Sequence, residues 1–101
     1  MRDRMGLDAI LKDIIGSDKV YFQPPEGFKL SYPCIVYEVD SIDTNYADDN
    51  PYRFSKCYLV TLMDRNPDSQ YVERILNIQT CRTTRVFTSD RLYHYVFKIY
   101  Y

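Results

Sequence analysis

The fold of this chain is decided by two β-like stretches, YPCIVYEV at residues 32–39 and SKCYLVTLM at residues 55–63. Both are rich in β-branched and aromatic residues, which favour strands. Pro33 cannot donate a main-chain hydrogen bond, so it places the beginning of the first stretch at a sheet edge or a strand start. We expect the two stretches to pair as antiparallel neighbours.

A long, polar and acidic connection joins these strands, DSIDTNYADDNPYR at residues 40–53. Connections longer than about 12 to 15 residues are uncommon in compact domains unless they bind something or project as an arm. Ile42, Thr44 and Tyr46 alternate with other residues in this stretch, so part of it is itself predicted to be strand. We therefore predict an extended hairpin, and residues 41–53 are called the arm below.

An amphipathic helix is predicted before the hairpin. Leu7, Ile10, Leu11 and Ile14 recur at the spacing of one helix face. Gly16 is a natural stop, because glycine readily adopts the left-handed conformation that ends many helices. A short β-like piece, VYF at residues 20–22, follows the helix.

A second helix and two more strands are predicted after the hairpin. Asn66 is expected to cap the helix and Pro67 to occupy its first position, where a missing donor costs nothing. Strands are predicted over residues 81–88 and 93–101. In the last strand an apolar, aromatic face alternates with a more polar one; the first face holds Tyr93, Tyr95, Phe97, Ile99 and Tyr101.

Together these elements predict one α+β domain over residues 1–101, in the order α-β-β-β-α-β-β. Its sheet is expected to be mainly antiparallel, with the N-terminal helix and the second helix packed on one face and the long β-hairpin arm projecting from it.

Charge and composition favour an interaction protein. The net charge of −1 gives no support for a nucleic-acid-binding surface. The acids and bases are unevenly divided, with ten acids and five bases in residues 1–50 against four and eight in residues 51–101. Such a division suits head-to-tail contact between copies, although it could equally cancel within one chain.

Three cysteines, Cys34, Cys57 and Cys81, are far apart and form no C-x-x-C pair, so we expect buried, reduced thiols. The first residues lack the apolar stretch of a signal peptide, and no run is long enough to span a membrane. These features predict a soluble protein made in the cytoplasm.

The sequence contains few candidate catalytic or metal-binding groups. His94 is the only histidine, and only Asp90 lies near it in sequence. A calcium loop needs spaced oxygens and usually a glycine, but no glycine follows Gly27. We therefore expect no enzyme, no metal site and no cofactor.

RNA binding through an aromatic sheet is an alternative of another class. Tyr93, Tyr95 and Phe97 on one strand resemble a base-stacking platform. The basic, glycine-containing pattern of such modules is missing, however, and these rings are expected to lie in the core beneath the helices.

Three stretches of the chain resemble a known group of proteins. They are YPCIVYE at residues 32–38, YADDNPY at residues 46–52 and YLVTLMDRNPDS at residues 58–69. They are similar to the tail terminator, or tail completion, proteins that tailed bacteriophages and prophages encode for head-tail joining. The run DRLYHYVF at residues 90–97 also fits, and the resemblance extends over about residues 21–101.

The resemblance implies a virion structural protein that assembles as a ring, commonly a hexamer, on the head-proximal end of the tail tube. Its partners would be itself, the tail tube protein and the head-tail connector proteins. DNA would pass through the lumen without specific binding, and no membrane is involved. The protein would be made in the host cytoplasm and would reside in the virion tail. A head completion or connector protein at the portal is the nearest alternative.

The arm is the predicted site of oligomer contacts. In proteins that the chain resembles, an extended hairpin takes part in assembly, and residues 41–53 occupy the matching place. Arg82 and Arg85 are predicted as possible partners of the arm. The arm residues predicted to make contacts are Asp43, Tyr46, Asp48, Asp49, Tyr52 and Arg53. Acidic side chains facing a lumen would also repel the phosphates of passing DNA.

Overall fold

The described part of the chain folds into two helices and five strands. The computed structural model describes residues 4–47, 50–78 and 81–101, and gives the main chain alone at 43–47, 50–55 and 83–84. The elements follow the predicted order: α1 (Arg4–Ile15), β1 (Val20–Phe22), β2 (Cys34–Ala47), β3 (Asn50–Asp64), α2 (Tyr71–Leu76), β4 (Cys81–Ser89) and β5 (Leu92–Tyr100). The predicted α+β class is confirmed.

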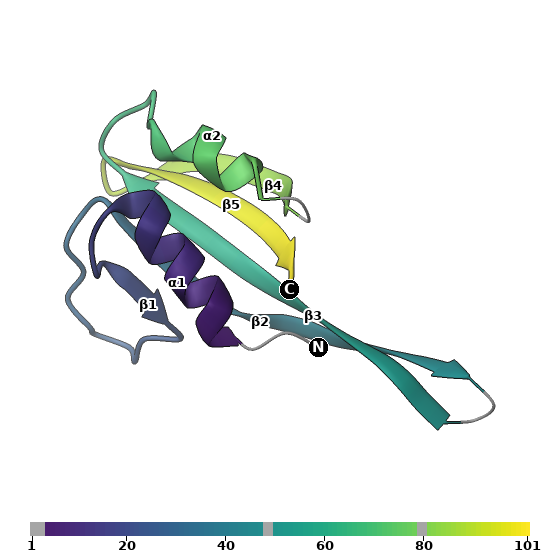
Figure 1. Cartoon of the computed structure of the whole chain (residues 1–101). Helices are drawn as coiled ribbons and strands as arrows, with labels where there is room; N and C mark the ends of the chain where they lie inside the picture. Colours follow the sequence, from purple (N-terminus) through teal and green to yellow (C-terminus); the bar gives the residue numbers. More distant parts are fainter. Residues whose placement is uncertain (1–3, 48–49, 79–80) are drawn as a thin grey trace.

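The strands form one sheet in the order β1-β2-β3-β5-β4 (Figure 1). The pairs β2–β3, β3–β5 and β4–β5 are antiparallel, and only the short β1 runs parallel to β2. Both helices cover the same face of this sheet (Figure 1). The predicted hairpin between the two central stretches is therefore confirmed, with β2 and β3 as neighbours.

The hydrophobic core lies between the helices and the sheet. Tyr95, Phe97 and Ile99 are buried in this core, as predicted for the apolar face of the last strand, but Val96 on the opposite face is buried as well. The core combines these residues with one residue each of β1 and α2, with the buried side of α1 and with alternate positions of β2 and β3: Val20, Ile75, Leu7, Leu11, Ile14, Ile15, Ile35, Tyr37, Tyr58, Val60 and Leu62.

A polar cluster ties α1 to the middle of β2. The Tyr37 hydroxyl donates a 2.6 Å hydrogen bond to the Asp8 carboxylate and accepts one of 2.9 Å from Arg4. Lys12 forms an ion pair of 2.9 Å with the same carboxylate. Burial acts to raise the pKa of Asp8, but the hydrogen bonds from Tyr37 and Lys12 and the neighbouring positive charges outweigh it, so that pKa is lowered. Burial and the bond to Asp8 raise the pKa of Tyr37 to about 12.

The buried face of α1 differs in part from the sequence prediction, whereas its end agrees with it. Ile10 was expected in the buried stripe but is 37% exposed, and Asp8 and Ile15 occupy buried positions beside Leu7, Leu11 and Ile14. The predicted stop at Gly16 is confirmed, since its φ is +71° and its N–H bonds to the Lys12 carbonyl. Gly6 allows the Tyr101 ring to lie against the helix, because a side chain at position 6 would meet the Tyr101 hydroxyl.

The second helix begins later than predicted. Asn66 was expected to cap it and Pro67 to be its first residue, but α2 begins at Tyr71. Asn66 instead accepts a hydrogen bond from the Asp68 N–H, and Asp64 accepts one from the Asn66 N–H. Short polar side chains that bond to nearby main chain in this way stabilise turns, which explains why this segment is a turn rather than a helix.

Candidate functional site

The arm is the continuation of β2 and β3 beyond the rest of the sheet. β1 pairs with β2 only from Ile35 to Tyr37, and β5 pairs with β3 only from Cys57 to Asp64. Within the described residues, β2 and β3 pair only with each other farther out, as far as Ala47 and Asn50. The molecule is consequently elongated, with extents of 51 × 27 × 23 Å, and the arm points away from the helices (Figure 1).

The polar connection predicted from sequence is thus mostly strand. Of the predicted contact residues, Asp43 and Tyr46 lie on β2, and Tyr52 and Arg53 lie on β3. The main-chain register pairs Asp43 with Ser55, Asn45 with Arg53 and Tyr46 with Pro51. Asp48 and Asp49 lie outside the described residues.

A β-bulge marks the base of the arm. The register of β2 against β3 shifts between Val39 and Ser41, which leaves Asp40 as the extra residue. The Asp40 carboxylate lies 3.5 Å from the Lys98 ammonium on β5 and 3.9 Å from the Cys57 thiol. Because a bulge bends its strand and increases the local twist, it fixes the direction in which the arm leaves the sheet.

The sheet face opposite the helices is the second candidate surface. Residues that alternate with the core positions point to this side. Both helices lie on the other side, so neither covers it. Strand pairing aligns two rows across four strands, and the residues of these rows are called the open face: Glu38, Leu59, Lys98 and Arg82 in one row, and Val36, Thr61, Val96 and Arg85 in the other.

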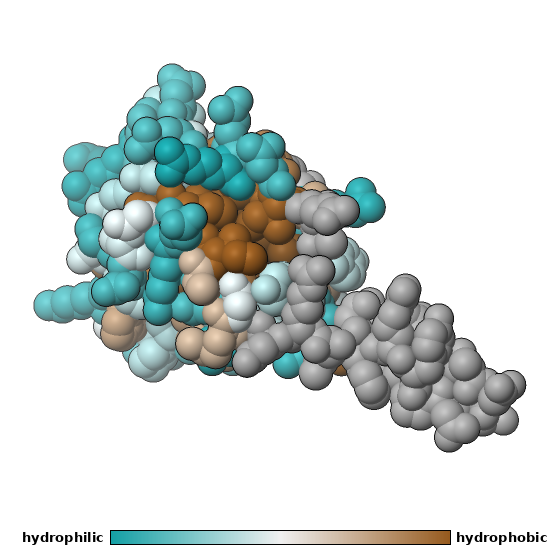
Figure 2. All heavy atoms as spheres, in the orientation of Figure 1, coloured by the Kyte–Doolittle hydropathy of each residue, from teal (hydrophilic) through white to brown (hydrophobic). Residues whose placement is uncertain are grey.

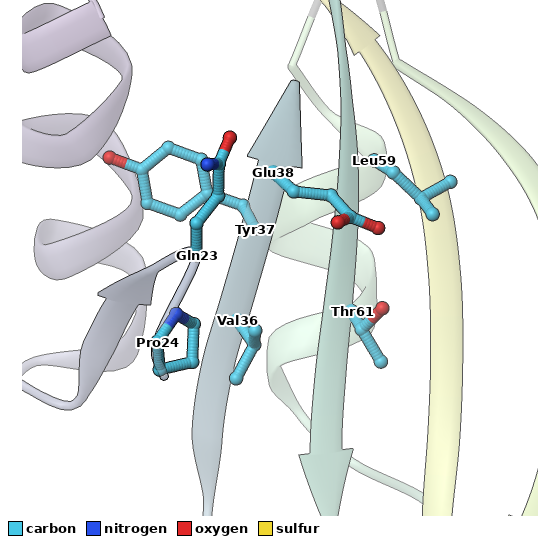
Figure 3. A pocket seen from close by; sticks show the side chains of 7 residues that line it. All are labelled: Gln23, Pro24, Val36, Tyr37, Glu38, Leu59 and Thr61. Carbon is cyan, nitrogen blue, oxygen red and sulfur yellow. The ribbon is translucent and has the colours of Figure 1, made fainter. Parts of the chain in front are cut away.

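The open face contains a hollow beside β1. It has a volume of about 210 Å³ and is lined by Gln23, Pro24, Val36, Tyr37, Glu38, Leu59 and Thr61. Figure 3 shows these side chains: the Tyr37 ring points toward α1, and Val36, Leu59 and Thr61 come from the two central strands. Glu38 contributes a carboxylate and Gln23 an amide, so the lining mixes polar and apolar groups in similar measure.

Gln23 directly follows β1, at the point where the strand stops, and forms one wall of the hollow. Its φ is +44°, so the chain turns away from β2 directly after the strand. Its N–H bonds to the Tyr37 carbonyl at 2.9 Å, and its side-chain oxygen accepts a 3.3 Å hydrogen bond from the Val39 N–H. The Gln23 side chain therefore supplies the acceptor that the main chain of a further β1 residue would otherwise offer to β2.

Arg82 and Arg85 lie on β4, at the sheet edge farthest from β1. Both are exposed. The Arg85 guanidinium lies 4.4 Å from the centre of the Phe87 ring, and Phe87 stacks on His94 at 4.6 Å with an interplanar angle of 10°. Within one copy, Arg82 and Arg85 lie beside β5 and not beside the arm. The predicted contact between these arginines and the arm would therefore join two copies.

No protein-family model and no curated protein sequence matches this chain.

His94 is held by packing and by a main-chain contact. Its Nδ1 lies 3.2 Å from the Leu92 carbonyl oxygen, which can only accept, so Nδ1 is the donor. No group of three or more histidine, cysteine or acidic side chains is arranged to hold a metal ion in the described part of the chain. In the same residues, no helix is long and apolar enough to cross a membrane. Cys34 and Cys57 are buried, Cys81 is half-buried, and all three are thiols that form no disulfide within the described residues.

The hollow and the two rows of the open face were not predicted from the sequence. Their residues alternate with core residues in β2 and β3, which is a signal that the sequence does contain. Their alignment across four strands depends on β5 lying between β3 and β4, and no local pattern specifies that order.

Proposed function

We propose that this protein is a structural component of a tailed bacteriophage or prophage virion, which closes into a ring on the head-proximal end of the tail tube and joins the tail to the head. The observation that carries this proposal is the arm, a two-stranded extension that leaves the packed body and whose described main chain pairs within the sheet only between β2 and β3. A small domain gains no packing from such an extension, so a contact outside the chain is the physical reason to have it.

Ring closure requires heterologous contacts, in which one patch of a subunit meets a different patch of the next. The two candidate surfaces meet this requirement, because they differ in shape and in charge. The arm sequence carries three acids, Asp43, Asp48 and Asp49, against one base, Arg53. The far edge of the sheet presents Arg82 and Arg85, both exposed. Contacts between copies would bring these opposite charges together.

A hexameric ring on the tail tube would also place this protein against passing DNA. Acidic side chains around a lumen repel phosphates and keep a duplex from adhering. The proposed partners are therefore further copies of the chain, the tail tube protein and the head-tail connector proteins. The proposed location is the head-proximal end of the virion tail, after synthesis in the cytoplasm of the bacterial host.

Electron microscopy of particles made without this protein tests the proposed position. Tails of abnormal length that carry no heads are expected, because nothing would stop tube growth or dock the head. Heads that lose their DNA beside tails of normal length would instead indicate the alternative, a head completion or connector protein at the portal. Normal, infectious particles would contradict both roles.

A shortened hairpin tests the role of the arm. Replacing residues 41–53 with a two-residue turn should leave a folded monomer that no longer forms rings, as measured by multi-angle light scattering and circular dichroism. Glu73→Gln, a change on the exposed surface of α2, is the matched control and should form rings normally. A shortened chain with the wild-type oligomer mass would contradict the proposal.

A further inference from the structure

The open face combines three features that suit a protein segment. It has a hollow in which apolar side chains such as Val36 and Leu59 lie beside polar ones, it has a carboxylate at Glu38 in that hollow, and it has two exposed arginines on β4. Neighbouring strands lie about 4.8 Å apart, so the hollow and Arg85 are roughly 14 Å from each other across β3 and β5. One elongated occupant could therefore reach both.

The arm has the length that this surface requires. Its β2 part, Ser41–Ala47, extends roughly 20 Å at the rise of a β-strand. The four strand spacings of the sheet also sum to about 19 Å. The arm of the same copy points away from the body (Figure 1), so the occupant would be the arm of another copy.

We infer that the open face of one copy receives the arm of a second copy, with an arm tyrosine in the hollow and the arm acids near Arg82 and Arg85. The inference rests on the proposed self-assembly and names the surface that the arm contacts. The arm carries two tyrosines for the hollow, Tyr46 and Tyr52.

The chemistry of the hollow fits a tyrosine. Sites for small-molecule ligands usually have about 300 to 1,000 Å³, so a hollow of about 210 Å³ suits one large side chain better than a free ligand. A phenol ring can pack on the apolar lining while its hydroxyl donates to the Glu38 carboxylate at the rim. Tyrosines in pockets of this kind are among the residues that contribute most to protein interfaces.

The charges of the open face also favour the arm. The ion pairs between described residues are Lys12–Asp8 and Lys98–Asp40, so in this part of the chain neither Arg82 nor Arg85 has a carboxylate partner. An acidic arm supplies the missing partners. Since such contacts are exposed, they would speed association and weaken as salt concentration rises.

Disulfide cross-linking between two differently tagged chains tests the contact. One chain carries Tyr46→Cys, or in a second pairing Tyr52→Cys, and the other carries Thr61→Cys. All have Cys81→Ser, so that the remaining native cysteines are the buried Cys34 and Cys57. Mild oxidation should join the two chains as a mixed dimer. In the matched control, Asp13→Cys on the exposed side of α1 replaces Thr61→Cys and should give at least tenfold less mixed dimer.

The outcomes separate the inference from the proposed function. Rings that form with no link from either arm position to Thr61, or that link equally well to Asp13, would overturn the inference and leave the ring intact. A wild-type chain that forms no oligomer at any concentration, and no cap on purified tail tubes, would overturn the proposed function as well.

Charge exchange provides a second test. Arg82→Glu with Arg85→Glu should weaken association at least tenfold, and changing Asp43, Asp48 and Asp49 to lysine should do the same. A chain with all five changes should regain association to within a few fold of the wild type. Thermal melts establish that each variant is folded. The inference would be contradicted if the chain with all five changes associated as weakly as the chain with only the arginine changes or only the aspartate changes.

Discussion

The inner and outer parts of the β2–β3 hairpin belong to the same two strands but have different surroundings. The inner part, Cys34–Val39 with Tyr58–Met63, has strand neighbours on both sides and helices over one face. In the outer part, the described residues of each strand pair only with the other strand, and Ile42 near its base is 56% exposed. Two-stranded hairpins are marginal in water without further packing. The stability of the domain should therefore reside in the inner part, and the outer part should serve contact with other chains.

Loss of a core ring should produce the largest effect on stability. Phe97→Ala removes a fully buried side chain between the helices and the sheet. Changes of this kind cost about 3 to 5 kcal/mol, through lost burial and the cavity left behind. Urea denaturation followed by circular dichroism measures the change. Ile42→Ala is the matched change in the arm and should cost no more than about 0.5 kcal/mol. Similar losses from both variants would mean that the arm contributes to the core.

Removal of the Asp8 charge should have an intermediate effect that depends on pH. The folded-state pKa of Asp8 lies below its usual value of 3.8, so the charged carboxylate stabilises the folded state above that value. This contribution is lost as pH falls through the folded-state pKa. Asp8→Asn should cost about 1 to 3 kcal/mol at pH 7, and the difference from wild type should shrink below pH 4.

Asp13→Asn, an exposed acid on the same helix, is the control for that series. Its free energy of unfolding should differ little from that of the wild type, both at pH 7 and below pH 4. A difference for Asp8→Asn that is constant between pH 7 and pH 3 would show that the amide disturbs packing instead of removing a favourable charge.

A smaller effect is expected at the end of α1. Gly16→Ala places a side chain on a residue with a φ of +71°, and no atom lies within 4 Å to cause a clash. The cost should therefore be that of the backbone conformation, about 1 kcal/mol. Chemical denaturation of Gly16→Ala beside Ala9→Gly, which tests helix propensity at an exposed site, distinguishes the two causes. An unchanged midpoint for Gly16→Ala would contradict the role of the left-handed stop.

The smallest effect should come from the largest deletion. The chain with residues 41–53 replaced by a two-residue turn should have the free energy of unfolding of the wild-type monomer within about 0.5 kcal/mol, because loop length alone has a weak effect on stability. Equilibrium denaturation at concentrations where both chains are monomeric measures it. A loss above about 2 kcal/mol would show that the arm supports the body.

The regular elements of the fold were predictable because local patterns specify them. Gly16 ends α1, and alternation assigns Tyr95 and Phe97 to the buried face of β5. The start of α2 was not predictable in this way. Asp64 and Asn66 accept hydrogen bonds from the main chain two residues later, and these bonds stabilise a turn at the position where a helix cap was expected. The partnership of Asp8 with Tyr37 joins residues far apart in sequence, so it depends on the folded chain.

The candidate site was predictable only in part. The arm and its acidic composition are visible in sequence, because a long polar stretch between two strands is unusual. The hollow is not, since it requires Gln23 to end β1 beside Val36 and Leu59. Arg82 and Arg85 were predicted as partners of the arm, but their alignment with Leu59 and Thr61 follows from strand order.

The extra residue at Asp40 bears on how many copies could assemble. A closed array requires that the rotation from each copy to the next divide a full turn evenly. If the arm is the joint between copies, the bend at this bulge contributes directly to that rotation. Deleting Asp40 would then straighten the joint without removing any aromatic or arginine side chain. The copies would meet at a different angle and close with another symmetry, or coil into an open spiral.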